Sequence, residues 1–365
     1  MPKYQNIAAK AYVVSSRGSP FVLQDIILDG VHEKEVLVEI KYTGICHTDI
    51  VVRDGDMPIG GYPAVLGHER VGVIREVGPG VQNKSLLPGD IVLLSFHTCG
   101  QCRPWEEGRL GGCLHMTKFF GQSSMSKLAI VAEKSVVKID AQPKDLQYLA
   151  PFSSGYLTGA GTILNVLKPH PTEKIAVLGL GAVGLAALEA AKAIGVETLI
   201  AVDLFDSKLQ RVVSVGATHT INSKEFMDIN AGIRSMFPDG VDKIVDTTSV
   251  ASLLNSSFKV LAHEETLALV GVPFPSALLQ VEALDVLLSC KKIVGVIEGL
   301  SDPRTINSKL INLYHEKKFP IDKLSTVYPT EDLDRAIADL KSGSVSHSLV
   351  YSASPFHVHL YQCQH

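Results

Sequence analysis

One stretch decides the fold of this chain: Lys174-Ile175-Ala176-Val177-Leu178-Gly179-Leu180-Gly181-Ala182-Val183-Gly184. Its first half is continuously apolar, which is typical of a strand buried on both faces of a parallel sheet. Its second half has glycines in G-x-G-x-x-G spacing and opens an Ala-rich helix over residues 183–194. Asp203 follows nineteen residues after the last glycine. A strand, a glycine turn, a helix and then an acid predict a dinucleotide-binding βαβ unit.

Further segments of strand length continue the series after this unit, and helical stretches separate most of them. They cover residues 199–203, 241–246, 267–271 and 293–297. This alternation predicts a doubly wound α/β sheet. Earlier in the chain the pattern differs: short, punctuated strands at 36–40, 71–74 and 91–94 predict a separate β-rich domain.

Length and composition exclude several classes of protein. A chain of 365 residues with 46% hydrophobic and 20% charged residues is expected to form two globular domains. A net charge of −4 argues against a nucleic-acid partner, and no apolar run reaches the roughly 18 residues of a membrane span. The N-terminus lacks a signal-peptide pattern, so the six cysteines are expected to be thiols or metal ligands in a cytoplasmic protein.

A candidate metal site lies in the first half of the chain. Residues 44–49 read Gly-Ile-Cys-His-Thr-Asp, and His68 follows twenty-two residues after Cys46, with Glu69 directly after it. Thiolate, imidazole and carboxylate are ligand types of a catalytic zinc ion that keeps one position open for substrate.

With these motifs the chain resembles the zinc-dependent medium-chain alcohol dehydrogenases, most closely their aryl-alcohol (benzyl-alcohol) branch, from about residue 10 to 350. The resemblance implies a GroES-like catalytic domain over 1–165, completed by 301–365, and a Rossmann NAD-binding domain over 166–300. It also implies a homodimer or homotetramer that acts on a small-molecule alcohol or carbonyl substrate.

The same resemblance gives roles to the residues of the metal site. Thr48 relays the proton of the alcohol, and Asp49 orients the histidine ligand. Ser154, in Pro151-Phe152-Ser153-Ser154-Gly155, stands where the family has a cysteine as third zinc ligand. A neutral serine is a poor ligand beside a thiolate. Two interpretations are therefore open: Cys46, His68 and Glu69 hold zinc together with water, or the site works without zinc.

The family's second zinc site is also altered. Cys99, Cys102 and Cys113 are present, but Trp105 occupies the place of a fourth cysteine. Since a structural zinc site needs four ligands, either a nearby side chain completes it or Trp105 packing holds the lobe without metal. The nearby candidates are His97, Glu106 and His115.

The expected cofactor is NAD(H). Asp203 accepts hydrogen bonds from ribose hydroxyls and repels the 2′-phosphate of NADP, while Lys208 also contacts the ribose. His47 and His347 are expected to contact the pyrophosphate. The remaining expected contacts with the cofactor are Thr158, Gly179, Gly181, Ala182, Val183, Gly184, Val270, Val272 and Val296.

The sequence thus predicts an NAD(H)-dependent oxidoreductase that interconverts a bulky or aromatic alcohol and its aldehyde or ketone. The alternative is a zinc-free reductase of a polarised C=C bond, of an enone or enal, in specialised metabolism. A non-redox isomerase or scaffold is a third class, which the intact glycine turn disfavours. Candidates for the apolar wall of the substrate pocket, or equally for core packing, are Met57, Phe96, Phe119, Phe120 and Met125. The segment 352–365, with three histidines, is expected to be a loosely packed tail.

Overall fold

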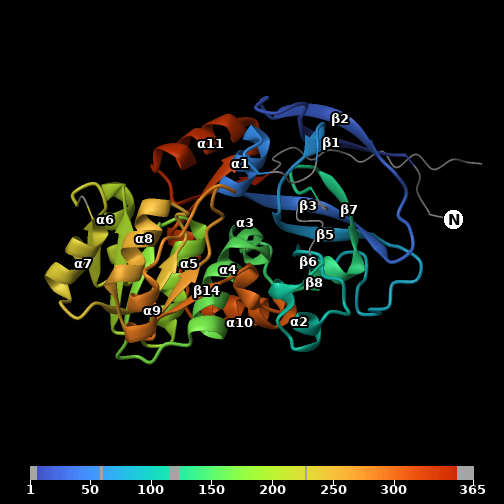
Figure 1. Ribbon diagram of the computed structural model, residues 1–365. Coiled ribbons are helices and arrows are strands. Elements are labelled where there is room, and N and C mark those ends of the chain that lie inside the picture. Colours follow the sequence, from blue (N-terminus) through green and yellow to red (C-terminus); the bar gives the residue numbers. More distant parts are fainter. Residues whose placement is uncertain (1–5, 58–60, 116–122, 227, 352–365) are drawn as a thin grey trace, which may run out of the picture.

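The computed structural model describes residues 6–57, 61–115, 123–226 and 228–351. Two sheets lie side by side in it (Figure 1). The predicted pocket residues Phe119 and Phe120 and the tail 352–365 fall outside the described residues.

The first sheet is six-stranded and parallel, in the order β11-β10-β9-β12-β13-β14. Chain order reverses direction across the sheet beside β9, which is the arrangement of a doubly wound Rossmann fold. This confirms the predicted fold class. The sequence reading missed β11, a short and polar edge strand. The elements of this part are β9 (Lys174–Leu178), α5 (Ala182–Ala193), β10 (Thr198–Asp203), α6 (Asp206–Val213), β11 (His219–Asn222), α7 (Ile229–Met236), β12 (Val241–Asp246), α8 (Ala251–Val260), β13 (Leu261–Leu269), α9 (Ala283–Ser289) and β14 (Lys292–Gly295).

The second part is β-rich, as expected. A seven-stranded sheet has the order β15-β16-β3-β5-β6-β8, with β7 also paired to β3, and a small sheet has the order β2-β1-β4. The last described strand, β16, pairs antiparallel with β3, so the end of the chain completes this sheet. Its strands are β1 (Ile7–Val14), β2 (Val22–Leu28), β3 (Glu35–Ile45), β4 (Ala64–Val65), β5 (Glu69–Val77), β6 (Ile91–Leu94), β7 (Leu128–Ala132), β8 (Val136–Lys138), β15 (Ser325–Pro329) and β16 (His347–Tyr351).

Helices join and flank the two sheets. The α-helices outside the parallel sheet are α1 (His47–Asp54), α2 (Arg103–Glu106), α3 (Leu146–Leu149), α4 (Gly155–Gly161), α10 (Pro303–His315) and α11 (Leu333–Ser342). Short 3-10 or π turns are η1 (Leu110–Gly112), η2 (Glu133–Ser135), η3 (Ala150–Ser153), η4 (Thr162–Leu167), η5 (Glu298–Leu300), η6 (Ile321–Lys323) and η7 (Thr330–Asp332). Of the described helices, none combines the length and hydropathy that a membrane crossing requires.

Helix α4 lies where the two parts meet, and its small residues let it approach helix α5 closely. A Cβ added to Gly159 would come within 1.9 Å of the Val183 carbonyl oxygen at the start of α5. One continuous core includes Leu93 of the β-rich part, Tyr156 of α4 and Leu185 of α5. The two parts therefore share a hydrophobic core at the place where the candidate site lies.

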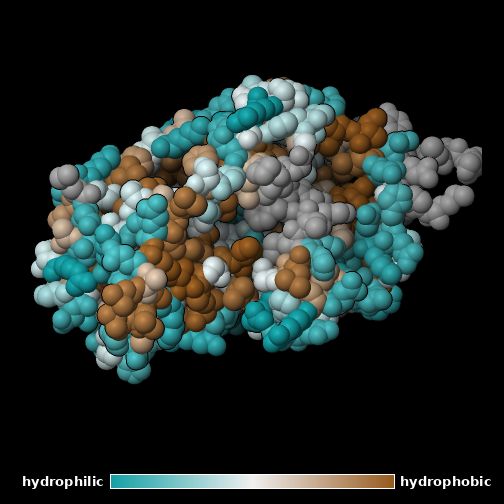
Figure 2. All heavy atoms as spheres, viewed as in Figure 1, coloured by the Kyte–Doolittle hydropathy of each residue, from teal (hydrophilic) through white to brown (hydrophobic). Residues whose placement is uncertain are grey.

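One face of the parallel-sheet part is apolar. Figure 2 shows hydrophobic side chains gathered over α9 and β14. Exposed large hydrophobic residues in and before α9 include Phe274, Leu278, Leu284, Leu287 and Leu288.

Candidate active site

The site begins where β3 runs into α1. Cys46 is the residue that caps the N-terminus of α1, and Asp49 lies in the first turn of that helix. The backbone N–H of Cys46 donates to Asp49 Oδ2 over 3.0 Å. The Cys-His-Thr-Asp order therefore folds into a helix start that holds the thiol and the carboxylate together.

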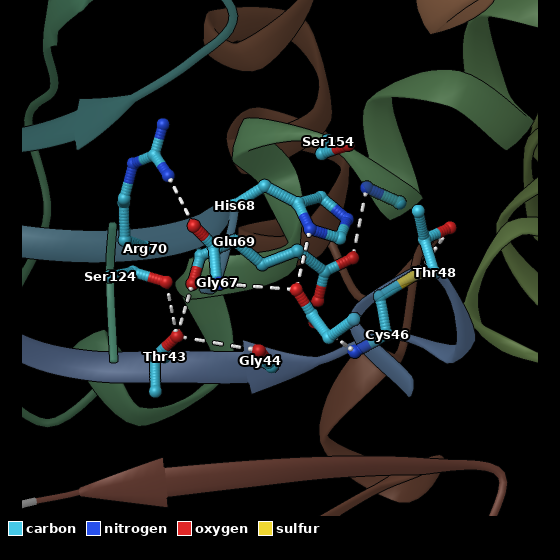
Figure 3. A network of polar contacts seen from close by, with 12 residues as sticks. Thr43, Gly44, Cys46, Thr48, Gly67, His68, Glu69, Arg70, Ser124 and Ser154 are labelled. Carbon is cyan, nitrogen blue, oxygen red and sulfur yellow. Dashed lines mark hydrogen bonds and ion pairs between the residues drawn. The ribbon is translucent and has the colours of Figure 1, made fainter. Parts of the chain in front are cut away.

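Asp49 also reaches the candidate ligand on the neighbouring strand. Its Oδ1 atom accepts from the backbone N–H of Gly67 and lies 3.1 Å from Nδ1 of His68 (Figure 3). Burial alone would lower the pKa of His68, but Asp49 and Cys46 raise it well above its usual value. The carboxylate thus stands where an imidazole needs a partner that fixes its orientation.

Glu69 is fully buried between two glycines, Gly44 of β3 and Gly155 of α4. Its Oε1 atom accepts from the backbone N–H of Gly155 over 3.1 Å, and Oε2 lies 2.9 Å from His347 Nε2. A Cβ on Gly44 would lie 1.9 Å from Oε2, and one on Gly155 would lie 2.5 Å from Oε1. Burial acts to raise the pKa of Glu69, but His347 and its other partners lower it. The carboxylate is therefore held as an anion.

These side chains fit a zinc ion. The ligand atoms of Cys46, His68 and Glu69 lie within 4.8 Å of one another. Thr48 Oγ1 lies 3.5 Å from Cys46 Sγ, at the edge of this group. The structure thus brings together the ligands, the orienting acid and the hydroxyl that the sequence predicted.

Ser154 has a partner that the sequence analysis missed. Its Oγ donates to Oε1 of Glu298 over 3.1 Å, and Thr158 Oγ1 donates to Oε2 of the same carboxylate over 3.2 Å. Burial raises the pKa of Glu298 to about 7. Its signal in the sequence was weak: it is an acid just after the last apolar strand, at the sheet edge where cofactors bind.

Arg70 is a second missed residue. Its guanidinium is buried next to the metal site and donates from one Nη atom to the Gly67 carbonyl over 3.0 Å. Burial lowers the pKa of Arg70 to about 9, against the opposing effect of Asp49, Glu298 and Glu69. One buried cation thus lies among three buried acids. Thr43 Oγ1 donates to the Glu69 carbonyl over 2.9 Å (Figure 3).

The glycine turn fits a dinucleotide. A Cβ on Gly184 would lie 1.9 Å from the Gly179 carbonyl, so the helix can start this close to β9 only with glycine there. A Cβ on Gly181, by contrast, would meet no atom within 4 Å. Gly181 caps α5, so open space lies at a helix N-terminus, which suits a pyrophosphate. Asp203 accepts from the backbone N–H of Leu180 over 2.8 Å and so ties the turn to the end of β10.

Two lysines, Lys341 and Lys208, act on the pKa of His47, the residue that follows the cysteine of the metal site. His47 keeps contact with solvent, but desolvation together with Lys341 and Lys208 lowers its pKa. Lys208 Nζ lies 4.0 Å from Asp203 Oδ2. Lys341, on α11, was not foreseen, since nothing in its sequence context links it to the glycine turn.

The other predicted cofactor contacts differ in where the structure places them: some lie at the ends of the parallel strands and others do not. Val270 and Val296 follow the carboxyl ends of β13 and β14, and Thr158 faces Glu298, whereas Val272 is half exposed. His347 is buried against Glu69 rather than lying with His47 and Lys208. The pairing of β16 with β3 fixes that position.

The second cysteine group is compact. Cys113 Sγ lies 3.6 Å from Cys99 Sγ and 3.8 Å from Cys102 Sγ, and the backbone N–H of Cys99 donates to Cys113 Sγ. Within the described part of the chain, no fourth ligand atom joins all three thiols. Neither His97, Glu106 nor His115 is thus brought into the group, and Trp105 packs against the main core.

The predicted pocket residues that the structure describes are mostly core residues. Phe96 belongs to the core shared by both parts, and Met125 to a smaller core beside β1 and α11. Met57 packs against that smaller core and is only partly buried.

Comparisons with known proteins agree with this geometry. Residues 32–141 match the alcohol dehydrogenase GroES-like domain, and residues 182–315 match the zinc-binding dehydrogenase family. Geraniol dehydrogenase of Castellaniella defragrans is 31% identical, over 92% of this chain and 96% of that protein. Alcohol dehydrogenase 1 of Solanum tuberosum is 30% identical, over 91% of this chain and 94% of that protein.

The fold comparison points the same way. The crystal structure of benzyl alcohol dehydrogenase from Acinetobacter calcoaceticus is similar with a TM-score of 0.89 and 34% identity, covering 95% of this chain and 99% of that one. A zinc-binding-domain alcohol dehydrogenase from Burkholderia ambifaria has the same TM-score at 33% identity, with the same coverage. This chain therefore belongs to the zinc-binding medium-chain alcohol dehydrogenase family and is an alcohol dehydrogenase-like oxidoreductase.

Proposed function

We propose that the chain is an NAD(H)-dependent, zinc-containing oxidoreductase that interconverts a bulky or aromatic alcohol and its aldehyde or ketone. One observation carries the proposal: a Cβ on Gly155 would lie 2.5 Å from Glu69 Oε1 and 3.4 Å from the Cβ of Ala182. The metal site and the first residue of the cofactor helix are thus separated by a single glycine. An alcohol on the metal would lie beside a cofactor bound at that helix.

The chain's own residues have distinct tasks in this reaction. Bound zinc polarises the alcohol oxygen, and bound NAD accepts the hydride. Asp49 holds the His68 ring in place, and Thr48 takes the proton of the alcohol. In the family that this chain resembles, the relay continues with a histidine, and Val51 occupies that position here. The proton would therefore leave through water or through the cofactor ribose.

The substrate class rests on the relatives. Benzyl alcohol dehydrogenase and geraniol dehydrogenase are named for bulky primary alcohols, and both resemble this chain over nearly its whole length. We assign residues 1–165, completed by 301–365, to the catalytic domain and residues 166–300 to the NAD-binding domain. In support, the strands of the parallel sheet, from Lys174 to Gly295, fall within the second range.

The test combines zinc analysis with a product assay. We expect bound zinc at the Cys46 site, and NAD reduction with benzyl alcohol and geraniol. With cinnamaldehyde and NADH, the expected product is cinnamyl alcohol. Full activity in protein free of zinc would contradict the proposed role of zinc.

A second candidate function is a zinc-free reductase of a polarised C=C bond. The observation that favours it is the Ser154 hydroxyl, which is bonded to Glu298 and adds no thiolate to the metal site. This candidate predicts the saturated aldehyde from cinnamaldehyde, and turnover that survives both a chelator and Cys46→Ser.

We also propose a homodimer. Strand β14 is the edge of the parallel sheet, and the apolar face over α9 adjoins it (Figure 2). An unpaired strand edge next to a hydrophobic surface is self-complementary, so a second copy can pair with it about a twofold axis.

A further inference from the structure

Glu298 enters the catalytic centre from the side of the cofactor sheet. It lies in η5, just after β14, and its side chain is 4% exposed. Backbone packing holds η5 against α4, because a Cβ on Gly161 would come within 2.8 Å of the Gly299 Cα. With no side chain between these backbones, the Glu298 carboxylate is carried to the start of α4.

Both carboxylate oxygens of Glu298 accept a hydrogen bond, and the two donors are neutral hydroxyls. Ser154 donates over 3.1 Å and Thr158, one helical turn further on, over 3.2 Å. Glu298 therefore spans the first turn of α4 on the side of the metal site.

Ser154 borders the metal site through its neighbour. The backbone N–H of Gly155 donates to Glu69, and Ser154 is the residue before it, at the start of the same helix (Figure 3). A neutral hydroxyl is a weak zinc ligand. When it donates its hydrogen to a carboxylate, however, its oxygen becomes more electron-rich, and such partners raise the basicity of a ligand.

We infer that Ser154 and Glu298 act as a pair at the position of the cysteine ligand that the family has and this chain lacks: Ser154 Oγ faces the ion beside the ligands Cys46, His68 and Glu69, and Glu298 supplies negative charge behind it. This inference rests on the proposed zinc-dependent function. No proton changes owner, since the hydroxyl hydrogen stays on Ser154 and is shared as a hydrogen bond. Glu298 is then a positioning residue that acts through Ser154.

The first experiment measures zinc affinity by competition with a chelator. Cys46→Ser, which removes a ligand of the catalytic site, shows how much zinc is bound outside that site. Glu298→Gln keeps the size of the side chain but removes its charge, and we expect affinity to fall about 10- to 100-fold. Ser154→Ala should lower it to a similar extent. Combining the two substitutions should add little, because they remove one shared contribution.

The second experiment repeats Glu298→Gln in a Ser154→Cys background. A thiolate carries its own charge, so the loss of Glu298 should no longer weaken zinc binding there. If Glu298 merely supported the fold, Glu298→Gln would weaken binding equally in both backgrounds. Glu189→Gln is the matched control, because Glu189 is another buried acid, in α5, that makes no contact with Ser154 or Thr158 in the described hydrogen bonds. It should leave zinc affinity unchanged.

The outcomes separate this inference from the proposed function. Zinc in the unmodified protein together with undiminished affinity in Glu298→Gln overturns the inference alone. Absence of zinc from the Cys46 site of the unmodified protein overturns both. NADH binding by each variant shows that the variant is folded. If Glu298→Gln does not fold, Ser154→Ala decides the question, because an unchanged zinc affinity in Ser154→Ala overturns the inference.

Discussion

At the scale of single residues, His47 sets the charge beside the expected pyrophosphate. Its surroundings lower its pKa, so it is neutral at and above pH 7. An anionic ligand favours the protonated ring, so affinity is gained only as the pH falls. NADH affinity should therefore stay flat between about pH 7 and 9 and rise below about pH 6.

Arginine at this position would stay charged throughout. His47→Arg should thus tighten NADH binding several-fold at pH 8 and remove the rise at acid pH, as measured by fluorescence titration. Lys341→Ala should weaken binding at every pH, because that charge is already present. An unchanged dissociation constant in His47→Arg would place the pyrophosphate elsewhere.

Asp203 should determine the choice of cofactor. A 2′-phosphate would bring negative charge against its carboxylate, at a cost of about 1–3 kcal/mol, or about 10- to 100-fold in affinity. We expect NADH to bind more tightly than NADPH by this factor and Asp203→Ser to narrow the gap. Equal affinities in the unmodified protein would contradict the assignment to NAD.

Residues in local motifs could be predicted, and residues fixed by distant pairing could not. Cys46, Asp49 and His68 lie in two short motifs whose chemistry is recognisable, and the structure brings them together. Glu298 reaches Ser154 across 144 residues of chain, and no local pattern announces such a contact. His347 was predicted from its position in a resemblance, but only the strand register places it against Glu69.

At the scale of elements, the turn between β9 and α5 offers a matched pair of substitutions. Gly184→Ala forces a Cβ to 1.9 Å from the Gly179 carbonyl, so it should destabilise the fold by about 1–3 kcal/mol. Gly181→Ala meets no protein atom within 4 Å and should leave stability nearly unchanged. Its methyl group would instead enter the space expected for the pyrophosphate and weaken NADH binding at least tenfold. Thermal unfolding and NADH titration of both variants check this; the opposite pattern would mean that the cofactor does not use the turn.

The second cysteine group, of Cys99, Cys102 and Cys113, lies in the lobe formed by α2 and η1. Zinc with four bonds of about 2.3 Å separates its ligand sulfurs by about 3.8 Å, which matches the observed 3.6 and 3.8 Å. We expect a zinc ion here with one ligand from solvent, which a chelator removes readily. Trp105→Cys should supply a fourth thiolate and slow zinc release. Glu106→Cys, one residue further along α2, is the control. No zinc in the lobe of either Trp105→Cys or the unmodified protein would contradict this expectation.

Element prediction succeeded where strands are buried on both faces. Strands β9 and β10 are nearly uninterrupted apolar runs, so their place in a parallel sheet could be read directly. Strand β11 has one buried residue, Ile221, and its pairing with β10 comes from the tertiary fold rather than from its own pattern.

At the scale of the whole molecule, the apolar face over α9 predicts the state of association. The unmodified protein should sediment at twice the chain mass of 39.3 kDa. Leu284→Asp with Leu287→Asp places two charges in that face and should give a monomer, since both side chains are more than 60% exposed in the single chain. Ile27→Asp, an equally exposed position on β2, should remain dimeric. A monomeric unmodified protein at micromolar concentration would rule out this interface.

The pairing of β3 with β16 has a consequence for the folding of the chain during its synthesis on the ribosome. The parallel sheet is built from one continuous segment, Lys174 to Gly295, and can assemble as soon as that segment has emerged. The β-rich sheet cannot be completed then, because β3, although it already pairs with β5 and β7, must wait for a partner strand translated about three hundred residues later. Until then the nascent chain exposes the edge of β3, and Glu69 lacks the histidine that lies 2.9 Å from its carboxylate. Synthesis that stops before His347 should therefore release a chain with a folded cofactor half and an open, aggregation-prone catalytic half, a natural substrate for chaperones.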